Sequence, residues 1–322
     1  MIGPVHIQNY KSIRELKFDA KRVNVYIGEP NTGKSNIVEA LAFFSPGVLK
    51  ASSEIFRFGT TSDLFYDQNI SNKLNVKAGD WEFGLTFDKK SFQGHFLQSV
   101  SPASQVPKGN LEMDYKQLSS WSEPKTPLRY YKFKPFDPFP GREPGALNPP
   151  FGDNLAALLY TNESLRKKIG ALFKEKGFRL QLKPTENELL IAKDVGDELY
   201  SYPWVAVSET LQRVAFYMAA LETNQNAALL LDEPETNTFP FYTTYLAERI
   251  ALDTSNQFFL TTHNPYVLGS IVGKTPVKDL AVFIVSMENY ATKLKAVSPE
   301  GLSKILDYGP DAFLNLDKLA EA

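Results

Sequence analysis

The 322-residue sequence predicts an α/β fold, with a mainly parallel core sheet flanked by helices and an added antiparallel β lobe. An apolar, β-branched run at 23–27 leads through a glycine-rich loop into a helical pattern. From residue 208 onward, helical segments alternate with two strands that are apolar on both faces, 227–231 and 258–260, as in a parallel sheet. Alternating apolar residues over 73–98, interrupted by turn residues, predict antiparallel hairpins.

Further elements follow from the same patterns. Alternation predicts a pair of N-terminal strands, and a long apolar stripe predicts a helix that an Asp or Asn caps and Gly177 ends. In chain order we expect strands over 2–9 and 13–18, a helix over 153–176, strands over 178–183 and 187–193, helices over 209–223 and 239–252, and a terminal helix from Pro299.

The composition excludes several classes of protein. There is no cysteine, so disulfides, a catalytic thiol and Cys-ligated zinc are absent, as is typical of a reducing compartment. No apolar run approaches the length of a membrane span, and the N-terminus lacks the pattern of a signal peptide. The formal net charge of −2 gives no global basic field for nucleic acid, although a local patch is compatible with it. We therefore expect a cytoplasmic protein with no membrane partner.

The segment 101–150 has a different character. It holds ten of the 21 prolines together with several aromatic residues, and proline at this density prevents long helices and central strands. We interpret it as an extended segment laid over the protein. The alternative is a nucleic-acid-binding arm, because four basic residues alternate with the aromatics: Lys125, Arg129, Lys132 and Lys134.

The glycine-rich loop fits G-x-x-x-x-G-K-[ST] at every fixed position, between a strand and a helix. In this context the loop N–H groups and the helix N-terminus bind phosphate, Lys34 reaches the β/γ-phosphates, and the Ser35 hydroxyl coordinates Mg²⁺. The loop thus predicts a bound nucleoside triphosphate with Mg²⁺, and the family resemblance described below implies that the nucleotide is ATP. The predicted nucleotide-binding residues are Gly28, Glu29, Pro30, Asn31, Thr32, Gly33, Lys34, Ser35 and Asn36.

Two later strands end in side chains suited to hydrolysis. Asp232 and Glu233 follow the strand 227–231, where Asp232 would hold Mg²⁺ and Glu233 would orient and deprotonate a water. His263 follows the next strand, where it would contact the γ-phosphate or the attacking water. The alternatives are that the two acids cap a turn and that the histidine is structural. We predict Lys34, Glu233 and His263 as the catalytic residues.

Four segments resemble the ABC-type ATPases of the RecF, SMC and OLD group, specifically small stand-alone members labelled AAA-type ATPases. They are the opening Ile7–Ile13, the loop Gly28–Ser35, Leu231–Glu235, and Thr262–Pro265. The resemblance implies a Walker A loop, a Walker B strand with a catalytic Glu233, and a His-switch at His263.

The same resemblance implies an ABC signature at the start of a helix, for which Ser208–Arg213 is the match. Thr210 stands where the family has glycine, and its Cβ hinders close approach to a γ-phosphate across a dimer interface. Ser208 still offers a hydroxyl and an N-cap. Gln68 is our candidate for the Q-loop residue. No heptads for a coiled coil occur, and no Asp-x-Asp of a Toprim domain follows His263, so we expect no DNA cleavage by this chain alone.

We expect one ABC-type ATPase domain over 1–322. Its parts are the P-loop and antiparallel lobe (1–98), a Pro/aromatic-rich insertion (99–152), a helical and hairpin subdomain (153–207), and the lobe with signature, Walker B and His-switch (208–322). The resemblance implies an ATP-driven homodimer that hydrolyses ATP and controls a DNA-maintenance or anti-phage-defence effector, with DNA and a separately encoded nuclease or toxin as partners. The alternatives are an ATP-gated scaffold with negligible hydrolysis and the nucleotide-binding subunit of an ABC transporter.

Overall fold

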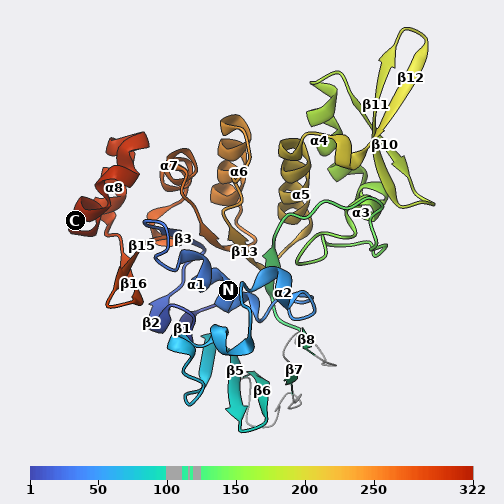
Figure 1. Cartoon of the computed structure of the whole chain (residues 1–322). Helices are drawn as coiled ribbons and strands as arrows, with labels where there is room; N and C mark the ends of the chain where they lie inside the picture. The colour runs from blue at the N-terminus through green and yellow to red at the C-terminus, as the bar shows by residue number, and fades with distance from the viewer. Residues whose placement is uncertain (99–110, 115–116, 119–124, 322) are drawn as a thin grey trace.

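The computed structural model describes residues 1–98, 111–114, 117–118 and 125–321. Six of the strands in these ranges form a sheet in the order β16-β15-β3-β14-β13-β9, in which β16 alone runs antiparallel to its neighbour. This confirms the mainly parallel core (Figure 1). The bounds are β3 Val23–Ile27, β9 Leu128–Tyr131, β13 Ala228–Asp232, β14 Gln257–Thr261, β15 Leu280–Glu288 and β16 Ala291–Ala296.

The order of the central strands brings the predicted motifs to one edge of the sheet. β14 lies between β3 and β13, and Thr261 pairs with Tyr26 on one side and with Asp232 on the other. The three strands run parallel, so the segments that follow them emerge at the same edge. Gly28 follows β3 there, and His263 follows β14.

The antiparallel lobe is a second sheet, in the order β2-β1-β4-β5-β6-β7-β8 among the described strands. Its N-terminal strand pair and its hairpins confirm the alternation that the sequence shows. The bounds are β1 Pro4–Tyr10, β2 Ile13–Asp19, β4 Leu74–Ala78, β5 Trp81–Asp88, β6 Ser91–Gln98, β7 Leu111–Asp114 and β8 Gln117–Leu118.

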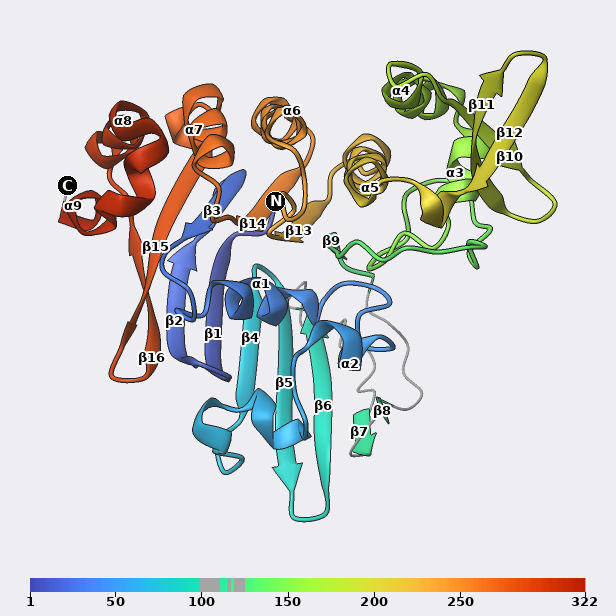
Figure 2. The same ribbon diagram turned by 45° about the horizontal axis from the view of Figure 1, so that its top comes forward.

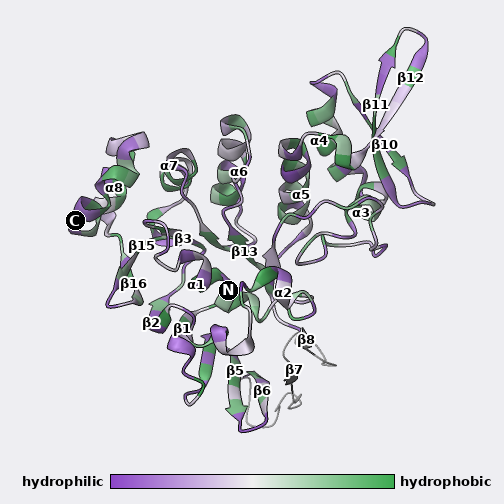
Figure 3. Cartoon of the chain, in the orientation of Figure 1, coloured by the Kyte–Doolittle hydropathy of each residue, from purple (hydrophilic) through white to green (hydrophobic). Residues whose placement is uncertain are grey.

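Helix α1 (Lys34–Ala42) lies between the two sheets, where it contacts β13 and β14 on one side and β1 and β4 on the other (Figure 2). The opposite face of the parallel sheet carries a row of helices, and Figure 3 shows apolar and polar stretches on each of them. The apolar sides cover the sheet and form one hydrophobic core, while α1 and the antiparallel lobe form a second. The row consists of α5 Glu209–Thr223, α6 Pro240–Leu252, α7 Pro265–Lys274, α8 Pro299–Tyr308 and α9 Leu316–Glu321.

A three-stranded sheet with two helices stands beyond α5 (Figure 1). The single helix expected over 153–176 is wrong, because the chain breaks at Asn162, whose side chain caps the second helix by accepting the N–H of Leu165. The third strand, β12, was not predicted from the sequence. Every one of its residues is exposed, so it has no buried face. The elements are α3 Leu155–Thr161, α4 Glu163–Lys174, β10 Arg179–Lys183, β11 Glu188–Val195 and β12 Glu198–Pro203.

Short helical turns complete the described chain. They are α2 Ser52–Ile55 and the 3₁₀ turns η1 Thr61–Leu64, η2 Tyr66–Gln68, η3 Trp204–Ala206, η4 Val277–Asp279 and η5 Gly309–Asn315. No helix in the described ranges has both the length and the apolar character that crossing a bilayer requires.

The proline-rich segment lies partly outside the described residues. In its described part, β9 pairs only with β13 at the edge of the sheet, and Tyr130 and Tyr131 are buried. The Lys132 ammonium donates to the Glu54 carbonyl at 2.7 Å, and that of Lys134 donates to the Glu54 carboxylate at 2.6 Å. These two lysines bind Glu54 of the same protein, which favours the extended segment over a nucleic-acid-binding arm.

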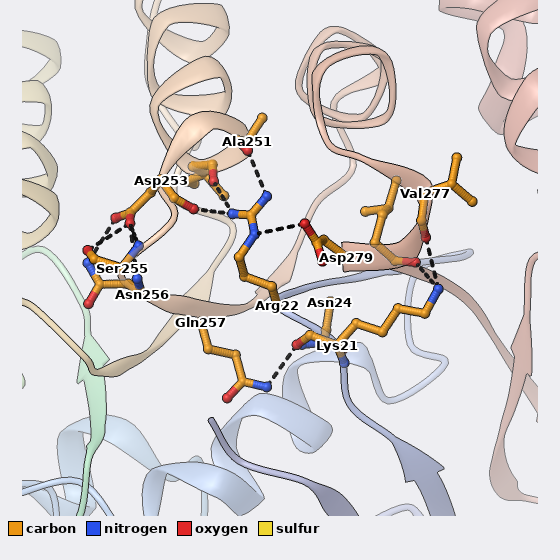
Figure 4. Close-up of polar contacts among 12 residues, drawn as sticks. Lys21, Arg22, Asn24, Ala251, Asp253, Ser255, Asn256, Gln257, Val277 and Asp279 are labelled. Atoms are coloured by element: carbon orange, nitrogen blue, oxygen red, sulfur yellow. Dashed lines mark hydrogen bonds and ion pairs between the residues drawn. The ribbon is translucent and has the colours of Figure 1, made fainter.

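At the edge of the sheet opposite the motifs, Arg22 fastens the end of α6 to the start of β3 (Figure 4). Its guanidinium is buried and donates to the carbonyls of Ala251, at 2.8 Å, and of Asp253. A cation suits the C-terminus of a helix because the last carbonyls lack partners and carry partial negative charge. This anchor fixes α6, the helix that connects β13 to β14.

Candidate active site

The motif Gly28–Ser35 covers the loop between β3 and α1 and the first two residues of α1. Steric contacts explain why positions 28 and 33 are glycine. Gly33 has a φ of +96°, and a Cβ on it would lie 2.1 Å from Oγ1 of Thr292. A Cβ on Gly28, whose φ is +150°, would lie 2.2 Å from the carbonyl oxygen of Val285. Both ends of the loop therefore touch the β15–β16 hairpin so closely that only glycine fits.

Lys34 is the first residue of α1 and only 5% exposed. Its ammonium donates to the carbonyls of Gly28, at 3.0 Å, and Glu29, at 2.6 Å, so the side chain lies along the loop. Burial lowers the pKa of Lys34, and the nearby carboxylates of Glu233 and Asp232 partly oppose that effect. The cation is thus held where the loop encloses it, beside the hydroxyl-bearing Ser35.

The end of β13 is linked to the end of β14 through Thr261. The Thr261 hydroxyl donates to Oδ1 of Asp232 at 2.6 Å and accepts the backbone N–H of Glu233 at 3.0 Å. Glu233 itself adopts a φ of +45°, a left-handed conformation that costs free energy for a residue with a Cβ. The threonine therefore fixes Asp232 and turns the next residue toward the loop.

His263 reaches the same place from β14. Its Nε2 lies 3.2 Å from Oε1 of Glu233, and each side chain is about two-fifths exposed (38% and 40%). Burial, together with the positive charge of Lys34, lowers the pKa of His263, so its imidazole is neutral at pH 7. A neutral imidazole can donate one hydrogen bond and accept another.

Beneath these groups lies a carboxyl that the sequence analysis did not assign. Glu235 is buried, accepts the backbone N–H of His263 at 3.2 Å, and accepts the Thr262 hydroxyl. Burial raises its pKa to about 7. Glu235 therefore links the Asp232–Glu235 turn to the segment that carries His263.

These residues surround a cavity of about 520 Å³. The described residues that line it include most of the predicted loop and both predicted catalytic side chains at the strand ends, and they add three residues that our sequence analysis gave no role. The lining residues are Lys11, Ser12, Pro30, Asn31, Gly33, Lys34, Ser35, Asn36, Arg57, Glu233 and His263. Lys11 and Ser12 lie in the opening motif, whereas nothing in the sequence pattern marks Arg57.

A buried carboxylate holds two of the added residues. Glu39, on α1, is 2% exposed, and its Oε1 accepts Nε and Nη2 of Arg57 at 3.1 and 2.9 Å. Its other oxygen accepts the Lys11 ammonium and, at 3.3 Å, the Tyr10 hydroxyl. Two cations from distant segments are thereby fixed at the cavity wall by one acid, which suits a polyanionic ligand.

Two predicted site residues lie elsewhere in this single chain. Gln68 donates to the carboxylate of Asp63 at 2.9 Å and is not among the cavity-lining residues. Ser208 is the N-cap of α5 and lines a separate, mostly apolar hollow. The neighbouring Thr210 uses its hydroxyl within the chain, donating to the Asn237 carbonyl at 2.9 Å.

Comparison with protein families gives two matches. A family model described as "AAA ATPase domain" matches residues 1–190, which is more than half of the chain. A second, described as "AAA domain, putative AbiEii toxin, Type IV TA system", matches residues 145–269. The two matches overlap and together span the loop, the Walker-B-like strand and His263.

Individual proteins are similar at lower levels. The uncharacterized protein MJECL10 of Methanocaldococcus jannaschii is 34% identical over 114 residues, or 31% of this chain and 52% of that protein, so the chain spans about half the length of this curated relative. The crystal structure of an SMC head bound to the C-winged helix domain of ScpA superposes with a TM-score of 0.55 at 15% identity, over 94% of this chain and 99% of that one. An SMC head domain from Thermotoga maritima gives a TM-score of 0.42 at 15% identity, over 92% and 99%. The first superposition shows an SMC-head fold.

Proposed function

Since the chain belongs to the AAA ATPase domain family, we propose that its cavity binds ATP with Mg²⁺ and hydrolyses it to ADP and phosphate. The observation that carries the proposal is the meeting of Lys34, Glu233 and His263 at one cavity that the glycine loop closes. Lys34 begins α1 after the glycine loop, whereas Glu233 follows β13 and His263 follows β14, and each has a distinct use in phosphoryl transfer to water.

The residues present fit the triphosphate and its metal ion. Only glycine at positions 28 and 33 lets the loop pack against the β15–β16 hairpin in this conformation. In this conformation the loop N–H groups and the N-terminus of α1 would bind the phosphates. Ser35 and Asp232 offer the hydroxyl and carboxylate oxygens that Mg²⁺ prefers, and Mg²⁺ in such sites takes its remaining ligands from substrate phosphates and water. The metal ion would supply neutralisation of charge on the phosphates. Lys34 would add to this by leaving the loop carbonyls for a phosphate oxygen.

The two strand-end side chains would act on the attacking water. Glu233 would orient the water and accept its proton, while His263, held neutral by burial and by Lys34, would donate a hydrogen bond to a phosphate oxygen. Because Nε2 of His263 lies 3.2 Å from Oε1 of Glu233, a change in the position or protonation of one side chain would affect the other. Lys11 and Arg57, which line the same cavity, would also contact the phosphates.

We further propose that two copies close on ATP, each site being completed by the partner's α5. Two observations support Ser208 for this contact. Among the described residues its side chain makes no capping bond to α5, so the hydroxyl is not used at that helix start, and a free helix N-terminus favours an anion. The Thr210 hydroxyl, by contrast, already donates to the Asn237 carbonyl. Closure on ATP and opening after hydrolysis would make the protein a switch.

The output of this switch is proposed from similarity alone. The family match that names the AbiEii toxin supports an effector of the defence or toxin–antitoxin type. The SMC head bound to a winged helix domain is a neighbour in fold that binds a second protein. DNA and a separately encoded nuclease or toxin are accordingly the partners to test.

Phosphate release and mass measured together test the function. We expect the chain to release phosphate from Mg-ATP, to double its light-scattering mass with ATP, and to lose both when Lys34 is replaced by Ala. Mass doubling without phosphate release would instead support the ATP-gated scaffold, which Thr210 favours. Adding duplex DNA to both assays shows whether DNA changes the rate of phosphate release or the mass. If the chain binds no ATP, the proposal is wrong.

A further inference from the structure

A chain of four hydrogen-bonding groups runs beneath the glycine loop. The Asn36 amide donates to the Ser12 hydroxyl at 2.7 Å, and that hydroxyl lies 2.7 Å from Oγ1 of Thr292. Oγ1 of Thr292 donates to the Thr32 carbonyl at 2.9 Å. Since a hydroxyl has only one hydrogen to give, Thr292 must accept from Ser12, and all the bonds then run in one direction.

This series of hydrogen bonds begins and ends in the phosphate-binding segment, but its two middle groups belong to other parts of the fold. Asn36 is on α1 and Thr32 is in the loop, whereas Ser12 is in the β1–β2 turn and Thr292 is on β16. A backbone bond from the Thr292 N–H to the Ser12 carbonyl, at 2.8 Å, fixes the turn to β16. Thr292 is 1% exposed, so its hydroxyl has no water to replace a missing partner.

The bond to Thr32 has a geometric consequence at the cavity. A trans peptide is planar, and its C=O and N–H point in opposite directions. The hydrogen bond from Thr292 directs the Thr32 carbonyl toward β16. The N–H of the same peptide belongs to Gly33 and is therefore directed away from β16. Gly33 lines the cavity. A hydroxyl 260 residues away in the sequence thereby sets the direction of a loop N–H.

We propose that Thr292 is a positioning residue for nucleotide binding, which acts through the Thr32–Gly33 peptide and the Ser12 hydroxyl. This inference rests on the proposed function. It assigns to the C-terminal β15–β16 hairpin the role of a support that holds the phosphate loop in its binding conformation before ATP arrives. Such preorganisation raises affinity, because less conformational freedom is lost on binding.

The test is a pair of substitutions of nearly equal shape. Thr292→Val removes the hydroxyl and leaves the backbone bond to Ser12, whereas Thr292→Ser retains the hydroxyl. We expect Thr292→Val to weaken the binding of MANT-ATP and to raise KM for ATP, each about tenfold, with kcat within about twofold. Thr292→Ser should bind within about twofold of the unaltered chain. Tyr290→Ala, at the exposed tip of the same hairpin, should have no effect.

The outcomes separate the inference from the proposed function. If the unaltered chain does not bind MANT-ATP, the proposed function is wrong and this inference with it. If the unaltered chain binds and Thr292→Val binds equally well, Thr292 has no positioning role. If Thr292→Ser is as weak as Thr292→Val, the methyl packing matters and the hydrogen-bond chain does not, which also overturns the inference. Circular dichroism melts identify any variant that is simply unfolded.

Discussion

Nε2 of His263 lies 3.2 Å from Oε1 of Glu233, although the two side chains follow different strands of the parallel sheet. Further hydrogen bonds join the same two segments: the Thr261 hydroxyl bonds Asp232 and the Glu233 N–H, and the Glu235 carboxylate accepts from Thr262 and from the His263 N–H. The acids of one segment thus pair with the polar groups of the next. We expect substitutions here to change turnover more than nucleotide affinity.

The first prediction concerns Glu233. Glu233→Gln keeps the size of the side chain but removes the base, so phosphate release should fall by about 10²- to 10⁴-fold. Binding of MANT-ATP should change by less than about threefold, and the ATP-bound dimer should persist in light scattering. Glu288→Gln, an exposed carboxylate on β15, is the control. Turnover at the parental rate would show that Glu233 is not the base.

The second prediction concerns His263. Removal of the imidazole in His263→Ala should lower kcat by about 10- to 100-fold while leaving ATP affinity nearly unchanged. Burial and Lys34 lower the pKa of His263, so the midpoint of the loss of activity on acidification should lie below pH 6.5, the ordinary histidine value. A pH–rate profile of both proteins checks this. An acidic limb at or above pH 6.5 that disappears in His263→Ala would contradict the lowered pKa.

The third prediction concerns stability and pH. Burial raises the pKa of Glu235 from 4.5 to about 7, so the folded state holds its proton more tightly than the unfolded state does. The group's contribution to stability is therefore complete below pH 4.5, falls as the pH rises toward 7, and is constant above. The full change is about 3 kcal/mol.

Urea unfolding between pH 4.5 and 8 measures this effect. Glu235→Gln, which cannot ionise, should lose the part of the pH dependence that Glu235 contributes, so the difference between the two free energies of unfolding should change across this window. The comparison uses the difference between the two curves, because other groups titrate equally in both proteins. Parallel curves would show that Glu235 titrates at an ordinary pKa.

The fourth prediction concerns Glu39, which binds the cavity-lining Lys11 and Arg57. Glu39→Gln removes the charge that holds Lys11 and Arg57, so affinity for MANT-ATP should fall about tenfold. Arg57→Ala should have a similar effect, and the double variant should lose less binding free energy than the sum of the two single losses, since both residues act through one contact. Glu300→Gln, exposed on α8, is the matched control. Strictly additive losses would show that Arg57 does not act through Glu39.

The fifth prediction concerns the glycine loop. Gly33→Ala places a Cβ 2.1 Å from Oγ1 of Thr292 in a left-handed conformation, so it should abolish MANT-ATP binding and lower the melting temperature. Gly170→Ala lies in the middle of α4, where a Cβ would meet no atom within 4 Å apart from its chain neighbours and the nearby backbone of its own helix, so it should instead stabilise the protein by about 0.5–1 kcal/mol. A Gly33→Ala protein that binds nucleotide normally would contradict the close packing on β16.

Local pattern predicted much of the fold. The apolar strands were found because strands buried on both faces have uninterrupted apolar runs, and α5 begins and ends where its spacing indicates. The break at Asn162 was missed, because the apolar stripe continues through it while the cap redirects the chain. β12 was missed because an exposed edge strand has no buried face to produce alternation.

The sequence by itself determined the residues whose chemistry depends on their immediate neighbours: the glycines, Lys34 and Ser35 of the loop, and the acids and histidine after two apolar strands. A turn, a helix start and a strand end are local, so spacing reveals them. Only the tertiary structure decided that Arg57 lines the same cavity as the loop, that Glu39 binds Arg57, and that Thr292 bonds the Thr32 carbonyl of the loop. They are brought there by strand order and by the packing of α1 between two sheets, which long-range contacts fix and no local pattern encodes.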